Sequence, residues 1–188
     1  MKRRPSKQAC IVAVLVLLAL IPVAARLLGF GDQLSPANLR ALIQRSGQWG
    51  ELAFVTLFVG AMLGQVPGVP FVIAAPALFQ LPEAFLLCFA ASNLALMINF
   101  AMLRKFGVRD LVQLKRPRLR QILTELDDHP IRTVALIRTI TVMFPPVTGV
   151  LALTRVRARD HAIGSALGLL LPLTILLWIA ATLLESVP

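Results

Sequence analysis

The feature that most constrains this chain is a run of 31 residues without a charged side chain, Leu52–Pro82. As a straight helix it would be about 46 Å long at 1.5 Å per residue, whereas the hydrocarbon core of a bilayer is about 30 Å thick. The run contains Pro67, Pro70 and Pro76. Proline removes a backbone donor and clashes with the preceding turn, so we expect the helix to break within Gly64–Pro70. The run therefore predicts either one kinked crossing or a hairpin that returns to the same side.

Four further runs lack charged side chains. They are Gln8–Ala25 with 18 residues, Ala84–Leu103 with 20, Thr139–Thr154 with 16 and His161–Leu184 with 24. Hydrophobic residues make up 57% of the chain and charged residues 15%, against about 45–50% and about 25% in soluble domains. The sequence thus predicts an all-α integral membrane protein and excludes most soluble enzyme classes. Because the basic residues stand between the apolar runs, the net charge of +10 indicates anionic lipid head groups rather than nucleic acid.

The first run has two interpretations. Basic residues, an apolar stretch and the sequence Val23-Ala24-Ala25 imitate a signal peptide with its cleavage site. However, 18 uncharged residues are long for the apolar core of a signal peptide. We therefore predict an uncleaved N-terminal anchor helix over residues 1–30, and cleavage stays open as the alternative.

The positive charges predict how the chain crosses the membrane. If the N-terminus is cytoplasmic, a full crossing by Leu52–Pro82 would place the basic loop 104–132 outside, against the positive-inside rule. A full crossing by residues 133–154 would export a second basic group. That group is Arg155, Arg157 and Arg159. With two hairpins instead, fifteen of the 19 basic residues are cytoplasmic and three are outside, so the charges favour hairpins.

The predicted fold has about three full spans and two opposed, Pro-broken re-entrant hairpins in an inverted-repeat arrangement. A membrane domain over residues 38–184 follows the anchor helix. Its parts are a hairpin at 52–82, a span at 84–103, a cytoplasmic amphipathic loop at 104–132, a hairpin at 133–154 and a span at 161–184. We expect a multi-pass protein of the cell membrane (plasma or inner), with a cytoplasmic N-terminus.

Two broken helices within the membrane predict a polar pocket between them, because irregular backbone is tolerated there only where protein or water covers it. Half-helices that begin after Pro70 and Pro146 would present N–H groups and a positive dipole end to an anion. The candidate substrate-binding residues around this pocket are Gln65, Pro67, Gly68, Pro70, Asn93, Asn99, Pro145, Pro146 and Thr148. For Asn93 and Asn99, hydrogen bonding between helices is the competing interpretation.

Arg138 is the basic residue that this topology leaves within the membrane. It lies six positions after Arg132, about 9 Å deeper if the segment is helical. An ionisable residue at such depth is by default a functional candidate, with snorkelling to the head groups as the alternative. Arg155, Arg157 and Arg159 would form a head-group rim, or serve only as an orientation signal.

The sequence predicts no cofactor and no metal site. Cys10 and Cys88 lie in apolar runs, where a thiol behaves as a small hydrophobe, and His129 and His161 have no ligand at metal spacing. The stretch Gly164–Gly168 imitates a nucleophile elbow, but its serine is misplaced and no strand precedes it. We interpret this stretch as small residues for helix packing. No nucleophile–base pair is evident, so we do not expect an enzyme.

Two stretches carry a family resemblance. One is Leu39–Gly50 leading into Pro67-Gly68. The other runs from Ala135–Arg138 through Leu153–Asp160 to Gly164, Gly168 and Pro172. They resemble the VTT-domain family, also called the SNARE-associated Golgi protein family, which is related to bacterial DedA. Because the acidic residues of DedA proteins are missing near the first hairpin, the chain looks closer to the Golgi-vesicle-protein branch than to DedA proper.

The resemblance implies two opposed re-entrant hairpins and a role in moving lipids. Relatives are associated with phospholipid scrambling or with the return of lipid carriers or phosphatidylethanolamine across the membrane. Arg138 matches the family's arginine before the second hairpin, and Pro67 and Gly68 match its first-hairpin Pro-Gly pair.

We therefore expect a transporter or scramblase type of protein for phospholipid or polyprenyl phosphate. The alternative is a non-transporting membrane scaffold or an assembly factor for envelope or membrane proteins. The expected partners are membrane lipids with anionic head groups and no nucleic acid, and the sequence leaves a homo-oligomer open.

Overall fold

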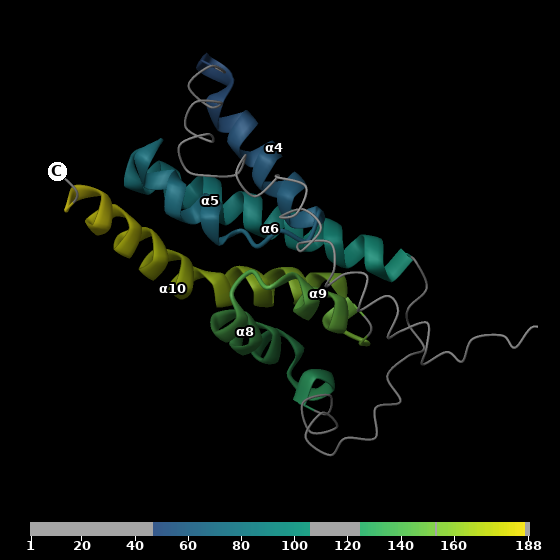
Figure 1. Ribbon diagram of the computed structural model, residues 1–188. Coiled ribbons are helices and arrows are strands. Elements are labelled where there is room, and N and C mark those ends of the chain that lie inside the picture. Colours follow the sequence, from purple (N-terminus) through teal and green to yellow (C-terminus); the bar gives the residue numbers. More distant parts are fainter. Residues whose placement is uncertain (1–46, 106–124, 153, 187–188) are drawn as a thin grey trace, which may run out of the picture.

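The computed structural model describes residues 47–105, 125–152 and 154–186 (Figure 1). Its elements are η1 (Gly47–Trp49), α4 (Gly50–Leu63), α5 (Val69–Ala74), η2 (Ala75–Ala77), α6 (Leu81–Lys105), α8 (Pro130–Thr141), α9 (Pro145–Ala152) and α10 (Ala158–Glu185). All of them are helices, so the predicted all-helical fold is confirmed for this part of the chain. The predicted anchor helix 1–30 and most of the predicted loop 104–132 lie outside the described residues.

Two of the helices, α6 and α10, are long and apolar enough to cross a membrane, judged by length and composition. Helix α6 has 25 residues, which corresponds to about 37 Å. Pro82 stands in its first turn, where its missing N–H leaves no bond unmade. Arg104 and Lys105 occupy its last turn, where cations complement the helix dipole. The third span and the membrane re-entry of the hairpins stay predictions.

Both helix interruptions expected from the prolines are present, and they share one design. Helix α4 ends at Leu63, and Gln65 then adopts a left-handed φ of 64° before Pro67 and Pro70. In the second half, α8 ends at Thr141 and Val142 has a φ of 51° before α9 opens with prolines. Positive φ is costly for a β-branched residue such as Val142. Packing elsewhere in the fold must therefore offset the backbone strain at the second break.

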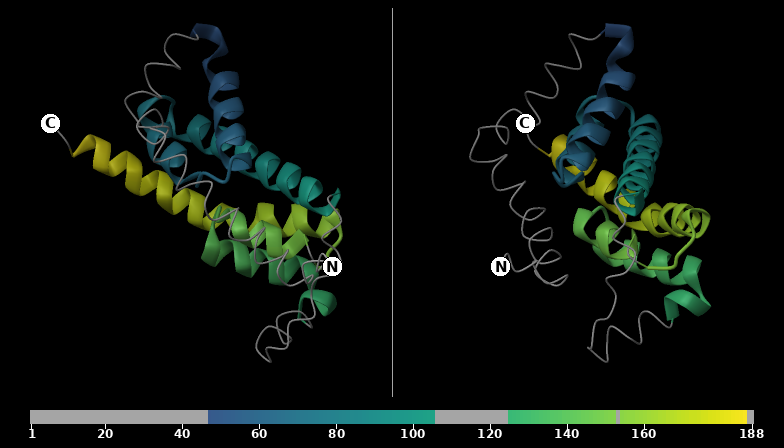
Figure 2. Two further views of the ribbon diagram at one scale, coloured as in Figure 1. Left: turned by 45° about the vertical axis from the view of Figure 1, so that its right-hand side comes forward. Right: turned by 90° about the vertical axis from the view of Figure 1, so that its right-hand side faces the viewer.

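The first half of the described fold contains α4, α5 and α6, and the second contains α8, α9 and α10. The two halves are interlocked through their short helices, α5 and α9. Helix α4 packs on α6, α8 packs on α10, and the long helices α6 and α10 contact each other. After each break the chain crosses over, so that α5 packs mainly on α10 while α9 packs on α6 (Figures 1 and 2). Each short helix thus contacts the long helix of the opposite half.

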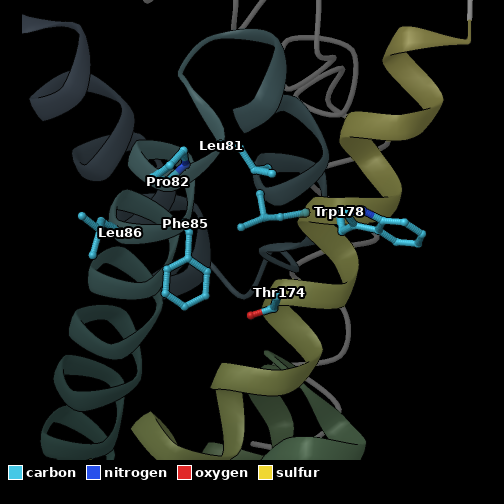
Figure 3. Close-up of a pocket in the computed structure, with 7 residues that line it drawn as sticks. Leu81, Pro82, Phe85, Leu86, Thr174 and Trp178 are labelled. Carbon is cyan, nitrogen blue, oxygen red and sulfur yellow. The ribbon is translucent and has the colours of Figure 1, made fainter.

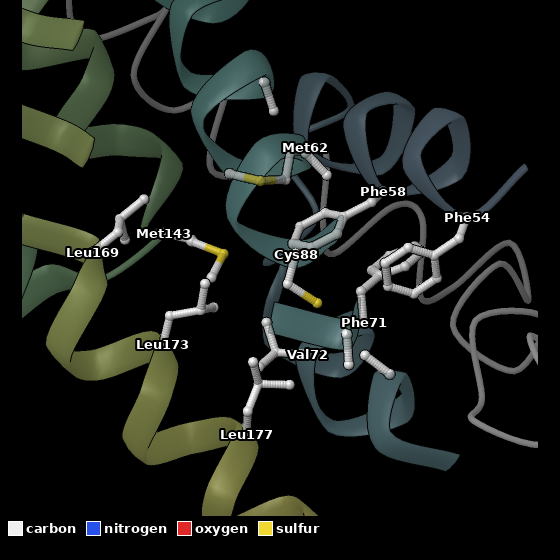
Figure 4. Packing of buried hydrophobic residues seen from close by; sticks show 14 of the residues in the cluster. Phe54, Phe58, Met62, Phe71, Val72, Cys88, Met143, Leu169, Leu173 and Leu177 are labelled. Atoms are coloured by element: carbon white, nitrogen blue, oxygen red, sulfur yellow. The ribbon is translucent and has the colours of Figure 1, made fainter. Parts of the chain in front are cut away.

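An aromatic core fills the first half. The rings of Phe58 and Phe71 stack with centroids 5.0 Å apart, and Phe54 meets Phe58 edge-on at 5.9 Å. Cys88 is a free, buried thiol beside this cluster, and Met143 enters it from the second break (Figure 4). All five side chains are 2% exposed or less, so buried apolar side chains surround the first break.

Large hydrophobic side chains cover much of the outer surface of α8 and α10. Ile140 on α8 is 82% exposed, and Leu171 and Trp178 on α10 are 60% and 62% exposed. A soluble monomer rarely leaves contiguous apolar surface of this kind open to water. These helix faces are therefore suited to contact lipid.

Candidate functional site

The side chain of Arg138 is completely buried, with 0% of it exposed, in the last turn of α8. Its Nη2 donates to the Thr148 hydroxyl of α9 at 2.8 Å and lies 3.3 Å from the Nε2 of His161 on α10. Its Nε lies 3.4 Å from the Ser165 hydroxyl, a long contact. The remaining nitrogen, Nη1, is buried and has no hydrogen-bond partner. The guanidinium thus joins three helices and leaves one nitrogen, with its two N–H groups, without a partner.

Two glycines allow α8 to approach α10 closely enough to bury this side chain. A Cβ added at Gly168 would clash with the Ala135 carbonyl and lie 2.7 Å from the Cβ of Arg138. A Cβ at Gly164 would lie 2.8 Å from the Ile131 carbonyl. Such close backbone approach through small residues four positions apart is typical of packed membrane helices. The interpretation of Gly164–Gly168 as a packing stretch is confirmed.

A row of planar side chains holds the His161 ring. The ring stacks on Phe100 of α6 with centroids 4.2 Å apart and an interplanar angle of 23°. The guanidinium of Arg104 lies over the same Phe100 ring, 4.7 Å from its centroid, within range of a cation–π interaction. Arg104 also donates to the Thr154 carbonyl at 3.0 Å. Helix α6 therefore fixes the histidine that contacts Arg138.

The electrostatics of the cluster are unusual, because the hydrogen-bond partners of Arg138 in the described residues are all neutral. Buried charges in proteins are normally paired, since removing an ion from water costs several kcal/mol. The position of Arg138 in the last turn of α8 offsets part of this cost through the helix dipole. A buried cation with neutral partners and an unused donor is suited to bind an anion.

Of the predicted site residues, the structure brings Arg138 and Thr148 together. Asn99 is buried on α6 with 7% exposed, and the amide of Asn93 donates to the Phe89 carbonyl of its own helix at 2.8 Å. Within the described residues, the hydrogen bonds of Arg138 go to α9 and α10 and not to the first break.

The residues of the first break have other surroundings. Gln65 is 7% exposed and sits at the left-handed turn, Pro67 is exposed, and Pro70 lies in the first turn of α5. A Cβ at Gly68 would lie 2.8 Å from the sulfur of Met143, so the two breaks meet there through an apolar contact.

In the second break, Pro145 and Pro146 open α9. The predicted head-group rim follows α9. It lies partly in the segment before α10 and partly in the first turn of α10. Its members, Arg155, Arg157 and Arg159, are all exposed. His161, which contacts Arg138, is two residues further along the same helix.

Sequence reasoning missed His161 and Ser165. The sequence suggested that His161 is an isolated residue at a segment edge, but the structure buries it against Arg138. The missed signal is a spacing. His161 and Ser165 are four residues apart, as are Gly164 and Gly168, so these four residues share the face of α10 that packs on α8.

A separate apolar hollow of about 580 Å³ lies between the start of α6 and the far half of α10 (Figure 3). It is lined by Leu81, Pro82, Phe85, Leu86, Thr174, Leu177 and Trp178. Among the described residues of this lining, Thr174 alone has a polar side chain besides the indole of Trp178, and its hydroxyl donates to the Leu170 carbonyl at 2.7 Å. The hollow therefore favours apolar contents.

Two membrane-capable helices, two proline-broken helix pairs and a buried cation point to a helical membrane protein. The family model of the VTT domain matches residues 66–182, which is more than half of the chain and includes Arg138 and all its partners. The chain therefore belongs to the VTT-domain family, the domain of SNARE-associated Golgi and DedA proteins. No curated protein matches the chain, and no solved structure does.

Proposed function

We propose that this protein moves phospholipid or polyprenyl phosphate across the bilayer, with Arg138 as the group that holds the head-group phosphate. The observation that carries the proposal is the fully buried guanidinium, whose partners are neutral and whose Nη1 has no hydrogen-bond partner. A phosphate oxygen would satisfy that donor and compensate the charge, and arginine is well matched to phosphate geometry.

In this proposal the helix pairs α4–α5 and α8–α9 are opposed re-entrant hairpins, and α6 and α10 are full spans. The N-terminus is cytoplasmic, and the protein is in the cell membrane. The interlocked packing, in which each short helix contacts the long helix of the other half, supports the inverted arrangement. The distribution of basic residues supports the orientation.

The exposed arginines just before α10 and in its first turn would draw anionic head groups toward the site. Arg155, Arg157 and Arg159 are all exposed, and each basic residue near a membrane surface contributes about 1 kcal/mol of attraction to anionic lipids. The acyl chains would stay in the surrounding lipid, along apolar helix faces such as that of Ile140. The hollow in Figure 3 could receive part of a chain. No bond is cleaved in this account, so the protein is not an enzyme.

The experiment is lipid flipping by purified protein in liposomes. Fluorescent phospholipid or polyprenyl phosphate is placed in both leaflets, and an impermeant quencher measures how fast the inner pool reaches the outside. We expect faster exchange with protein than in protein-free liposomes, and equal rates would contradict the proposal.

A membrane scaffold predicts a different pattern of variants. Charge reversal at Arg118 and Arg120, which lie outside the described residues, would abolish its function, while Arg138→Gln would be silent. The same liposomes and a complementation assay in cells separate the two functions.

A further inference from the structure

The apolar hollow between α6 and α10 lies at the end of these helices that is away from the arginines. At the other end, Arg104 of α6 donates to the Thr154 carbonyl in the segment before α10, and Phe100 stacks on His161. The hollow is lined by the first turns of α6 and by the far half of α10 (Figure 3). Helix α6 is about 37 Å long, which exceeds the roughly 30 Å of bilayer hydrocarbon. With α6 and α10 as spans, the hollow therefore faces the leaflet opposite the arginines.

The walls of the hollow make no polar demand on what fills it. None of the described lining residues is charged, and the hydroxyl of Thr174 already donates to the Leu170 carbonyl. Leu86 and Trp178 of the lining are 65% and 62% exposed, so the hollow is open to its surroundings. Its volume of about 580 Å³ is within the usual range of ligand pockets. A hydrocarbon chain suits such walls.

A second, smaller hollow of about 310 Å³ adjoins the first, since Leu81 lines both. It is lined by Pro76, Phe79, Gln80, Leu81, Ala181 and Leu184. Gln80 is exposed, directly precedes α6 and has the polar side chain of this lining. Its amide can donate to the ester or phosphate oxygens of a lipid. An apolar hollow that continues into one with a polar side chain at the helix end matches an acyl chain joined to its head group.

The charges at this end of the molecule discriminate between lipids. On α6 and α10, the charged residues nearest the hollow in sequence are Glu83 and Glu185, which are both acidic. The arginines lie about the length of α6 away, far beyond the Debye length of about 8 Å at physiological ionic strength. Their attraction for anionic lipids is therefore largely screened here, and a lipid without net charge is favoured.

We infer that this hollow binds one acyl chain of a zwitterionic phospholipid, whose head group lies at Gln80 in the leaflet opposite the arginines. The site is separate from the Arg138 cluster, because Trp178 lies about 25 Å further along α10 than His161. The inference goes beyond the proposed function, since a lipid can be held here without being transported.

The test is fluorescence quenching by phosphatidylcholine with a dibrominated acyl chain, added to the purified full chain in detergent micelles. The chain has 2 tryptophans, so Trp49→Phe leaves Trp178 of the lining as the reporter. We expect quenching that saturates at equimolar lipid and is reversed by the unbrominated lipid. The control reporter is Leu183→Trp in a protein without the native tryptophans, because Leu183 is 61% exposed on α10 and lines neither hollow. Its quenching should only follow the share of brominated lipid in the micelle.

Two phenylalanine variants of the reporter protein provide the second readout. Thr174→Phe fills the hollow and should raise the lipid concentration for half-saturation about tenfold or more, because the chain loses apolar contact area. Thr182→Phe is the matched control. Both threonines are exposed and donate to a carbonyl of their own helix, but Thr182 lines neither hollow. The control variant should therefore bind the lipid like the reporter protein.

Several results would overturn the inference. Quenching of Trp178 that does not saturate, or unchanged binding by Thr174→Phe, would show that the hollow holds no particular lipid. Tighter binding of dibrominated phosphatidylglycerol would contradict the zwitterionic head group. A smaller particle on gel filtration of Thr174→Phe, but not of Thr182→Phe, would assign the hollow to a contact between two copies of the chain.

The two proposals fail in different ways. If the protein flips no lipid but Trp178 shows saturable quenching, the proposed function is wrong and the acyl-chain site stands. If lipid flips and the quenching does not saturate, the acyl-chain site is wrong and the transport function stands.

Discussion

The two broken helices of this protein have the same backbone design and opposite contents. Each has a residue of positive φ after its first helix, followed by prolines and a short second helix. Around the first break the fold places phenylalanine rings, such as Phe58 and Phe71, in tight contact. Around the second it places the guanidinium of Arg138 among hydroxyls and an imidazole.

Under the proposed function, this difference assigns stability mainly to the first half and ligand binding to the second. Aromatic burial contributes large favourable free energy and needs no partner. A buried cation with neutral partners costs free energy, and such a cost is commonly retained where it serves function. Substitutions in the first half should therefore unfold the protein, whereas substitutions in the second should alter binding more than stability.

The largest effect on stability should come from Phe58→Ala. This ring is 0% exposed and contacts Phe54 and Phe71, so its loss should lower the free energy of unfolding by about 3–5 kcal/mol. Chemical unfolding in micelles, followed by circular dichroism, measures the change. Phe144→Ala is the matched control in the second break, where the side chain is 54% exposed, and it should cost far less. Similar losses at both positions would contradict the claim that the first half contributes more to stability than the second.

Gly168→Ala should have the next largest effect. The added Cβ would meet backbone of α8 at Ala135 and the Cβ of Arg138, so the helices must separate at a cost of about 1–3 kcal/mol. Gly60→Ala is the control, because nothing lies within 4 Å of its added Cβ. That control should be neutral or stabilising by up to about 1 kcal/mol. A tolerated Gly168→Ala would show that close contact does not position Arg138.

Thr148→Val tests whether the Thr148 hydroxyl stabilises the fold through its hydrogen bond to Arg138. Loss of the 2.8 Å hydrogen bond should destabilise the wild type by about 1–2 kcal/mol. In an Arg138→Met background the same substitution should cost almost nothing, because the charged donor is gone. Arg138→Met alone should leave stability unchanged or raise it, since apolar replacement removes the buried charge. Additive effects of the two substitutions would rule out the coupling.

The smallest change should follow Ser165→Ala. The Arg138 Nε lies 3.4 Å from this hydroxyl, at the weak end of hydrogen-bond geometry. We expect a loss below about 1 kcal/mol in the same unfolding measurement. A loss as large as that of Thr148→Val would mean that α10, rather than α9, supplies the main partner of the guanidinium.

The sequence predicts the helical fold and both interruptions because charge-free runs and prolines act through local physics. It also identifies Arg138, since an arginine within an apolar segment is conspicuous. It does not identify His161, whose partner is 23 residues away in the chain and depends on how α8 packs on α10. The aromatic core at the first break was likewise hidden, because phenylalanine spacing does not reveal which helix supplies the opposing ring.

The most direct test of the central claim is lipid flipping in liposomes by Arg138→Met and by Gln65→Met, each of which removes one buried polar side chain, from the second and the first half respectively. Folding of each variant is checked by circular dichroism and elution volume before reconstitution. The account predicts that Arg138→Met folds normally and falls to the protein-free rate, while Gln65→Met retains most of the wild-type rate. Wild-type flipping by a folded Arg138→Met protein would contradict it.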